Sequence, residues 1–306
     1  MDKILVTGGS GQVGSDLKSL KAKNGYKFFF PSSKELDIRK KNSLSSFLET
    51  NKINLVLNLA AYTDVDNAEK KRKLANDINF KGPLNLSLET SKRNIGLIHF
   101  STDYVFGKKN KSINPYKRRT SPVNYYGLTK SQGEEAVLSN SHLGLIIRLA
   151  SVYGLTGNNF IKTVVKLLLT SSEVRVVNDQ KISLTGSYEL ATNIFYLIDL
   201  YKEKIENRKF SPKIIHFTNK GYSSWYKVAK VVKNELELNL KKKVNAKLIP
   251  IKSADWESLA VRPLDSRLKV DYSLLEKKNI YLPKWEKSVR SFVKKILPIV
   301  KSDIKK

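Results

Sequence analysis

Short apolar runs alternate with amphipathic segments along most of the first 220 residues of the chain. The runs have few polar interruptions, which predicts short strands buried on both faces. The expected strands are 3–7, 27–30, 54–60, 97–101, 143–150, 174–177 and 213–218. The segments between them space apolar residues as helices do, for example 13–23, 43–50, 82–92 and 188–201. This alternation predicts an α/β fold with a doubly wound parallel sheet.

A glycine-rich turn follows the first expected strand. The stretch "GGSGQVG" places Gly8, Gly11 and Gly14 at the spacing GxxGxxG, directly before an expected helix. Glycine allows a tight turn and lets the backbone approach a pyrophosphate, whose charge is stabilised by free amides and the helix dipole. A plain glycine-rich turn is the alternative, but a strand-turn-helix at the amino terminus favours a dinucleotide site.

These patterns predict a Rossmann-type sheet with a smaller, mixed α/β substrate lobe. We expect residues 1–155, with later returns near 174–220, to form the dinucleotide-binding domain. Residues 156–306 show shorter, mixed patterns and should form mostly an intertwined substrate-binding lobe. No internal repeat or low-complexity linker is visible.

The end of the second expected strand bears on the choice of cofactor. An NAD site usually carries an acidic residue there to bind the ribose hydroxyls. This chain reads "FPSSKELDI", with no acid before Glu35, and Ser32, Ser33 and Lys34 could instead meet a 2′-phosphate. The sequence therefore favours NADPH over NADH, with NADH and an ordinary loop left open.

The chain is strongly basic, with 56 Lys and Arg against 28 Asp and Glu, a net charge of +28. This raises nucleic acid or an anionic membrane as partners. However, the basic runs at 69–73, 108–111 and 241–243 resemble solvated faces, and no nucleic-acid-binding module accompanies them. We expect neither nucleic acid nor membrane as a partner.

No stretch approaches the roughly 18 apolar residues of a membrane span, and the amino terminus shows no export signal. The chain contains no Cys, so disulfides and thiolate metal sites are excluded and the cytoplasm is the expected compartment. No cluster of metal-ligating residues is evident, so we expect no metal site.

Three tyrosines have a lysine four residues later: Tyr104, Tyr126 and Tyr226. Such a pair matters because a free phenol has a pKa of about 10, and a nearby ammonium favours its ionised form. At about 4 Å and an effective dielectric of about 20 the effect reaches up to about 4 kcal/mol. We therefore expect one lysine to lower the pKa of a proton-donating tyrosine.

The Tyr126/Lys130 pair is the one best placed for catalysis. The expected strand 97–101 runs into "STDYVFG", which puts Thr102 and Asp103 at the carboxyl end of a strand, where α/β sheets bind ligands. Tyr126 then opens a helix that places Lys130 on its own face. Gly107 lies between Tyr104 and Lys108, and this pair is expected in a loop. The Tyr226 pair is expected on a helix that no cofactor-binding strand precedes.

Several motifs together resemble the extended short-chain dehydrogenase/reductases, and within them the dTDP-4-dehydrorhamnose reductase family. They occur in the same order over almost the whole chain: "TGGSGQVG", "NLAAYTDVDNAE", "STDYVFG", "SPVNYYGLTKSQGEE", "RLASVYG", "NNFIKTVV" and "RPLDSRL". The resemblance implies reduction, with NADPH or NADH, of the 4-keto group of a nucleotide-activated 6-deoxy sugar. In that family the product is dTDP-L-rhamnose, used in polysaccharide synthesis. A homodimer remains open.

The resemblance also implies roles for individual residues. Tyr126 matches the proton donor, Lys130 the lysine that lowers its pKa and holds the nicotinamide ribose, and Thr102 and Asp103 the pair that meets the substrate. Asn79 matches a residue that fixes a helix. The other implied cofactor contacts are Gly11, Gln12 and Val13 in the phosphate turn, Asp37 and Ile38 at the adenine, and Ala60, Ala61 and Tyr62 in the floor.

This chain departs from the family pattern mainly in the sugar or nucleotide lobe. Ser151 replaces a tryptophan that contacts the substrate, Ile182 and Leu184 replace a glycine and a proline, and Tyr272 replaces a lysine. The reaction type is therefore better supported than the sugar, and a reductase for another nucleotide 4-keto sugar stays open. So does a regulatory subunit that resembles the methionine adenosyltransferase β subunit, although a regulator need not keep Thr102, Tyr126 and Lys130.

Overall fold

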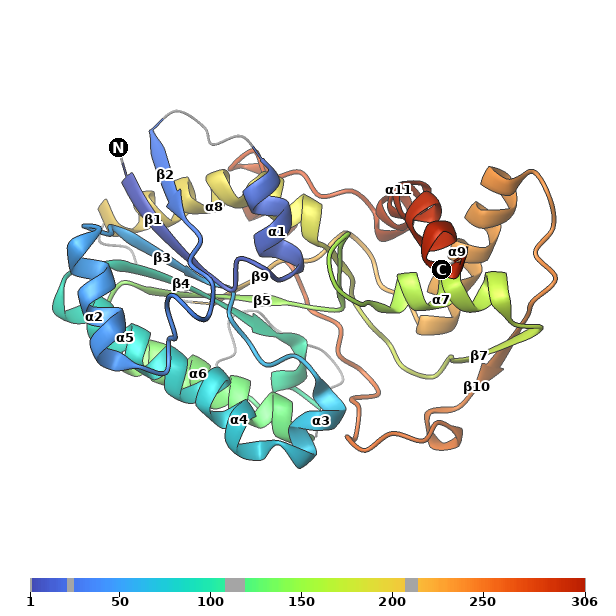
Figure 1. Ribbon diagram of the computed structural model, residues 1–306, viewed down its shortest axis with the longest axis horizontal. Coiled ribbons are helices and arrows are strands. Elements are labelled where there is room, and N and C mark those ends of the chain that lie inside the picture. Colours follow the sequence, from blue (N-terminus) through green and yellow to red (C-terminus); the bar gives the residue numbers. More distant parts are fainter. Residues whose placement is uncertain (1, 21–24, 108–118, 207–213, 306) are drawn as a thin grey trace.

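The computed structural model describes residues 2–20, 25–107, 119–206 and 214–305 (Figure 1). Its strands are β1 (Asp2–Thr7), β2 (Tyr26–Phe29), β3 (Leu55–Asn58), β4 (Gly96–Thr102), β5 (Gly144–Leu149), β6 (Val152–Tyr153), β7 (Glu173–Val177), β8 (Thr185–Gly186), β9 (Ile214–His216) and β10 (Lys247–Ile251). Its longer helices are α1 (Gln12–Ser19), α2 (Lys41–Thr50), α5 (Gly82–Lys92), α6 (Tyr125–Asn140), α7 (Phe160–Thr170), α8 (Ser187–Glu206), α9 (Trp225–Leu240) and α11 (Trp285–Lys305). The shorter ones are α3 (Val65–Lys70), α4 (Arg72–Asn76), α10 (Tyr272–Glu276), a π-helical turn η1 (Asp77–Lys81), and the 3₁₀ turns η2 (Asp103–Val105) and η3 (Ser253–Asp255).

Six strands form the main sheet in the order β2-β1-β3-β4-β5-β9, and every neighbouring pair is parallel. The chain leaves β1 toward β2 and then returns to the other side of β1 with β3. This reversal is the topological switch point at which doubly wound sheets open a binding crevice. The predicted α/β class and parallel sheet are confirmed.

Successive apolar residues of each strand point to opposite faces of this sheet, so the strands contribute to a core on both faces. Ile4 and Val6 of β1 belong to one core cluster, and Leu5 between them belongs to the other. Figure 1 shows α1 and α8 on the first face and α2, α5 and α6 on the opposite face. Burial on two faces explains why the runs contain few polar residues.

The smaller lobe contains α7, α9 and α11 beside the parallel pair β7 and β10 (Figure 1). The expectation that 174–177 returns to the main sheet is wrong, because β7 pairs with β10 instead. The sequence of β7 contains the reason. Glu173 and Arg175 are exposed while Val174 and Val176 are buried, so this strand has only one apolar face and would not fit a sheet covered on both sides.

The last part of the chain also contributes to the core of the sheet. Val270, Leu275, Ile280 and Leu282 pack in the same cluster as the apolar residues of α1 and α8. After this return the chain crosses back to the small lobe, where it ends in α11 (Figure 1). The two lobes are therefore intertwined by the chain.

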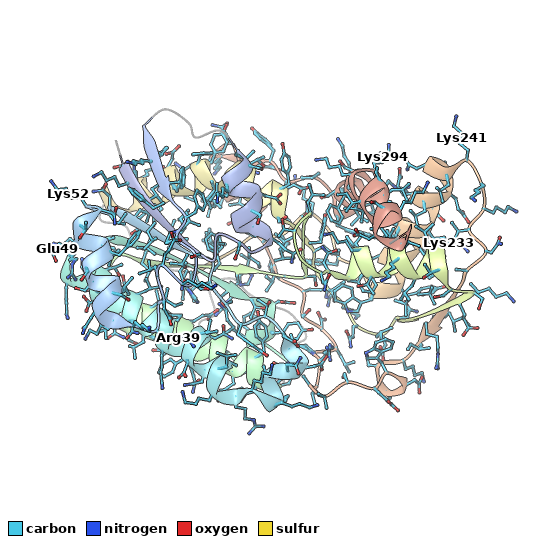
Figure 2. The ribbon with its side chains drawn as sticks, in the orientation of Figure 1. Arg39, Glu49, Lys52, Lys233, Lys241 and Lys294 are labelled. Atoms are coloured by element: carbon cyan, nitrogen blue, oxygen red, sulfur yellow. The ribbon has the colours of Figure 1, made fainter. Side chains whose placement is uncertain are left out.

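Basic side chains occur on both lobes. Figure 2 labels Lys52 on the sheet lobe and, on the small lobe, Lys233 of α9, Lys241 directly after α9 and Lys294 of α11. Within the described ranges, none of the helices combines the length and the apolar character needed to cross a membrane.

Candidate active site

A cleft of about 820 Å³ follows the carboxyl ends of β1, β3 and β4 and reaches the small lobe. All but two of the predicted site residues line it. They are Gly8, Gly11, Gln12, Val13, Gly14, Ser32, Asp37, Ile38, Ala60, Ala61, Thr102, Asp103, Tyr126, Lys130 and Ser151. The two exceptions are Lys34, which is exposed, and Tyr62.

The glycine-rich turn lies where β1 ends and α1 begins. Gly8 has a φ of 71°, and a Cβ atom there would come within 2.6 Å of the backbone nitrogen of Ala60. A Cβ atom on Gly14 would come within 2.6 Å of the Cα of Gly9. Gly11, the N-cap of α1, has no side chain to accept from the first amides of the helix. The turn therefore has the close backbone and free amides that a pyrophosphate requires.

The loop after β2 forms the next part of the cleft. Arg39, which also lines it, donates to the Asp37 carboxylate from Nε at 2.8 Å and from Nη2 at 2.7 Å. The Ser32 amide donates to the Glu35 carboxylate at 2.7 Å. Sequence reasoning chose Lys34 for this part of the site and missed Arg39, which lies beyond the first acidic residue of the loop.

Tyr126 and Lys130 lie in the first two turns of α6. Asn124 caps this helix: its Oδ1 accepts from the Gly127 amide at 2.8 Å, and its Nδ2 donates to the Val261 carbonyl at 2.8 Å. Tyr126 is 8% exposed and Lys130 1%. The Lys130 ammonium donates to the Phe100 carbonyl of β4 at 2.7 Å, which anchors it to the sheet.

The expectation that Lys130 brings the pKa of Tyr126 below its ordinary value is wrong for this structure, because the overall shift is upward. Burial raises the pKa of Tyr126 to about 12, and only a hydrogen bond with the Thr102 side chain acts in the opposite direction. Burial also lowers the pKa of Lys130 to about 8, against the attraction of Glu134. The sequence argument considered only the Coulomb attraction of the pair, whereas removal from water has the larger effect on both groups.

Thr102 is the last residue of β4 and Asp103 is the first residue of η2, beside Tyr126. The Thr102 hydroxyl donates to Asp103 Oδ1 at 3.1 Å and accepts from the Tyr104 amide at 3.2 Å. Burial raises the pKa of Asp103 to about 7, although hydrogen bonds, including that from Thr102, favour its charged form. A hydroxyl and a carboxyl group thus face the cleft next to the phenol.

Asn79 has the helix-fixing position that the sequence predicted. It lies in η1, and its Oδ1 accepts from the Tyr62 amide at 2.8 Å. Its Nδ2 donates to the Tyr62 carbonyl at 3.0 Å and to the Thr129 hydroxyl of α6 at 3.2 Å. The side-chain amide of Asn79 therefore ties the backbone of Tyr62 to α6.

The small lobe supplies the opposite wall of the cleft. Phe160 and Trp225 line it with ring centroids 4.5 Å apart, and the Trp225 indole donates to Gln180 Oε1 at 2.9 Å. Sequence reasoning missed this aromatic pair because the two residues are 65 positions apart. Of the departures from the family pattern, Ser151 and Leu184 line the cleft, whereas Ile182 and Tyr272 do not.

Gln12 connects the phosphate turn to the small-lobe side. Its Nε2 lies 3.4 Å from the Val152 carbonyl, and its Oε1 accepts from Asn159 Nδ2 at 3.1 Å. Asn159 is also the N-cap of α7, accepting from the Lys162 amide at 3.1 Å. One glutamine thus couples the start of α1 to the start of α7.

The other two tyrosine-lysine pairs are not part of this arrangement. Tyr226 and Lys230 lie on α9 and are absent from the lining of the cleft, and Lys108 lies outside the described residues. Among the residues that the structure describes, no group of three or more His, Asp or Glu is arranged to hold a metal ion.

The fold and the cleft define a Rossmann-type oxidoreductase of the short-chain dehydrogenase/reductase class: a phosphate turn at the switch point, with a tyrosine, a lysine and a threonine beside it. The chain belongs to the family described as the RmlD substrate binding domain, whose model matches residues 1–297.

Three similar proteins agree with this assignment. A dTDP-4-dehydrorhamnose reductase of Aggregatibacter actinomycetemcomitans is 33% identical over 270 residues, which cover 88% of this chain and 90% of the relative. A crystal structure of a dTDP-4-dehydrorhamnose reductase from Clostridium acetobutylicum ATCC 824 has a TM-score of 0.85 and 31% identity, covering 96% of this chain and 99% of that one. The enzyme from Bacillus anthracis str. Ames, solved in complex with NADP, has a TM-score of 0.83 and 29% identity over 95% and 98% of the two chains.

Proposed function

We propose that this chain is an NADPH-dependent reductase that converts the 4-keto group of a nucleotide-activated 6-deoxy sugar to a hydroxyl group. The substrate that the family membership favours is dTDP-4-dehydro-L-rhamnose, which gives dTDP-L-rhamnose. The observation that carries the proposal is that Thr102, Tyr126 and Lys130 line the same cleft as the glycine-rich turn.

The residues of the cleft fit a dinucleotide along its length. We propose that Gly8, Gly11, Gln12, Val13 and Gly14 bind the pyrophosphate, because a Cβ atom at Gly8 or Gly14 would meet backbone and the α1 amides are free. Asp37 and Ile38 would contact the adenine end of the cofactor, and Ala60 and Ala61 would form the floor of the cofactor site. When bound, the reduced nicotinamide supplies the hydride for the substrate carbon.

The chain itself supplies the proton. The Tyr126 phenol, with a pKa raised to about 12, is protonated at neutral pH and would donate its proton to the alkoxide that hydride transfer creates. The Thr102 hydroxyl would hydrogen-bond the same oxygen atom. Lys130, with a pKa of about 8, is mostly an ammonium at pH 7 and would stabilise the phenolate as it forms. Asp103 and Ser151 would contact the sugar.

The cofactor preference rests on the loop after β2. We propose that Arg39, together with Ser32, meets the 2′-phosphate of NADPH, because both residues line the cleft and the guanidinium carries a fixed positive charge. Arg39 also forms an ion pair with the Asp37 carboxylate. Without this ion pair, the carboxylate would be available to bind the ribose hydroxyls of NADH.

Oxidation of NADPH with a panel of dTDP-, UDP-, GDP- and CDP-linked 4-keto-6-deoxy sugars tests the function directly. We expect turnover with the dTDP sugar, and dTDP-L-rhamnose as the product by NMR. Turnover with another nucleotide only would correct the substrate, and no turnover with any of them would refute the reductase function.

Four further expectations accompany the function. We propose that residues 1–155 with the later return form the cofactor lobe and that most of 156–306 forms the substrate lobe. The compartment is proposed to be the cytoplasm, and a homodimer is compatible with the family. We propose that the basic surface is solvated and does not bind nucleic acid, because its lysines are distributed over both lobes (Figure 2).

A further inference from the structure

An ion pair outside the cleft joins Asp66 and Arg262, which lie 196 positions apart in the chain. Arg262 donates to the Asp66 carboxylate from Nη1 at 3.1 Å and from Nη2 at 2.6 Å, and the Ala260 amide donates to the same carboxylate at 3.0 Å. Neither charged side chain lines the cleft, and the reductase mechanism above uses neither of them. A two-point contact of this kind fixes orientation as well as distance, because the planar guanidinium matches the carboxylate.

Asp66 lies in the first turn of α3, a helix that packs against the start of α6. One turn further along α3, Glu69 accepts from the amide of Tyr125, the first residue of α6, at 2.8 Å. Ala68 of α3 belongs to the same apolar cluster as Tyr126. The helix that carries Asp66 is therefore in direct contact with the turn that carries the proton donor.

Arg262 lies on residues 256–264, which we call the crossing segment because it leaves the small lobe and reaches the sheet lobe beside α3 (Figure 1). Its far end is held by the small lobe. Lys181, in the loop after β7, donates its amide to the Leu264 carbonyl at 2.8 Å and accepts from the Ser266 amide at 2.9 Å. The ion pair thus connects a segment that is tied to the small lobe with a helix of the sheet lobe.

The tip of the crossing segment contacts both η2 and the start of α6. The Val261 carbonyl accepts from Asn124, the N-cap of α6, at 2.8 Å. Burial lowers the pKa of Arg262, but hydrogen bonds, including one with the Tyr104 side chain of η2, raise it above its ordinary value. The ion pair therefore holds a segment that touches η2 and α6 at the same time.

Tyr104 connects this contact to the proton donor. Its ring packs edge to face against the ring of Tyr126, with centroids 5.8 Å apart. A Cβ atom on Gly127, the next residue of α6, would collide with the Tyr104 carbonyl oxygen, so the two backbones approach as closely as glycine allows. Because groups packed this closely have little room to move independently, a displacement of Tyr104 would displace Tyr126.

We propose, resting on the reductase function above, that Asp66 and Arg262 are positioning residues for Tyr126. The ion pair holds the crossing segment against η2 and the cap of α6, and this contact sets the distance between the phenol and a substrate in the cleft. Since the crossing segment is also tied to the small lobe, the position of Tyr126 depends on how that lobe lies against the sheet lobe. Catalysis is sensitive to such positions, because a misplacement of about 1 Å can cost about a hundredfold in rate.

Steady-state kinetics of Asp66→Asn and Arg262→Lys tests this proposal. Asp66→Asn keeps the shape of the side chain but removes its charge, and Arg262→Lys keeps the charge but removes the two-point contact. We expect kcat to fall by about tenfold or more in each variant, with little change in KM for NADPH or for the keto sugar. The solvent deuterium isotope effect on kcat should increase, because proton transfer from Tyr126 becomes slower relative to the other steps. The double variant should lose little more than either single variant, since both changes break one contact.

Asp265→Asn is the matched control. Asp265 also forms a partly exposed ion pair with an arginine, Arg267, but this pair does not line the cleft. The control should leave kcat and the isotope effect unchanged. A loss of folded protein alone would lower the apparent kcat without changing the isotope effect, and fluorescence titration with NADPH counts the folded sites.

NMR of the full chain labelled at the tyrosine Cζ carbons tests the same contact without substrate, with Tyr126 assigned from the signal lost in Tyr126→Phe. We expect the Tyr126 signal to shift in Asp66→Asn and in Arg262→Lys and to stay in place in Asp265→Asn.

Three results would overturn the proposal. They are a wild-type kcat in either variant of the ion pair, a lowered kcat with an unchanged isotope effect, and an unshifted Tyr126 signal in a variant that near-ultraviolet circular dichroism shows to be folded. The NMR measurement needs no keto sugar, so failure of the wild type to reduce any of them would refute the reductase function separately.

Discussion

Tyr126 combines the two properties that a proton donor for a reduction needs. It lines the cleft, and its phenol, with a pKa of about 12, carries its proton at neutral pH. The ring also contacts that of Tyr104, edge to face at 5.8 Å, which fixes its orientation. Replacement of the hydroxyl alone should therefore affect chemistry more than binding.

We predict that Tyr126→Phe lowers kcat by about 10²- to 10⁴-fold, the usual contribution of a positioned acid. The affinity for NADPH, measured by fluorescence titration, should stay near that of the wild type. Tyr226→Phe is the matched control, because it removes the hydroxyl of another tyrosine that precedes a lysine by four residues. Wild-type turnover in Tyr126→Phe would show that another group donates the proton.

Substitutions of Arg39 and of Lys34 should have different effects on the choice between NADPH and NADH. Arg39→Ala removes a charge from the cleft and frees the Asp37 carboxylate, which would repel a 2′-phosphate and could bind ribose hydroxyls. We expect KM for NADPH to rise by about tenfold or more, equivalent to about 1.4 kcal/mol, with a smaller change for NADH. Lys34→Ala should change both values little, since this side chain does not line the cleft. A larger loss of NADPH binding in Lys34→Ala would restore the original assignment from sequence.

At the scale of elements, α6 depends on its N-cap for its position as well as its stability. Asn124 accepts from the first turn of the helix and also donates to Val261, in the segment that follows η3. The same side chain therefore fixes the start of the helix that carries Tyr126 and Lys130 and the loop that crosses beside it.

We predict that Asn124→Ala lowers the free energy of unfolding by about 1 to 2 kcal/mol, measured by urea denaturation, because a cap and a second, partly buried hydrogen bond are lost. The same variant should lower kcat, because the first turn of α6 carries the proton donor. Asp271→Ala removes the cap of α10, far along the chain from these residues, and should leave kcat unchanged. If Asn124→Ala kept both the stability and kcat of the wild type, the cap would have neither role.

The helices and strands show how much of the fold can be predicted from local sequence patterns. The strands of the main sheet and the helices between them follow from apolar runs, because a strand buried on two faces needs an uninterrupted run. β7 was assigned to the wrong sheet although its alternation of exposed and buried residues was readable in "EVRVV". The glycine turn, Thr102, Tyr126 and Lys130 were predictable because each belongs to a local motif.

Other parts of the site arise from packing between distant segments. Phe160 and Trp225 meet only because α7 and α9 pack together, and His99 meets Lys130 only because α6 lies on β4. The direction of the Tyr126 pKa shift depends on burial, which spacing along a helix does not reveal. These features required the three-dimensional arrangement.

At the scale of the molecule, Gln12 links the two lobes at the cleft. We predict that Gln12→Ala raises KM for the sugar by about three- to tenfold, since each lost hydrogen bond is worth about 0.5 to 1.5 kcal/mol. NADPH affinity should fall less, because the phosphate turn keeps its backbone amides. Asn140→Ala, which removes an amide that donates to the Ala136 carbonyl within α6, is the control. Steady-state kinetics with both substrates measures the difference, and a selective loss of NADPH affinity would contradict the coupling of lobes.

The packing of Val270, Leu275, Ile280 and Leu282 against α1 and α8 sets an order for folding during translation. The ribosome releases the sheet strands first, but the apolar surface that these four residues cover stays exposed until they emerge. A nascent chain that ends after β9 therefore presents an unfinished core to solvent and to chaperones. The first lobe to be synthesised becomes complete only when almost the entire polypeptide has been made.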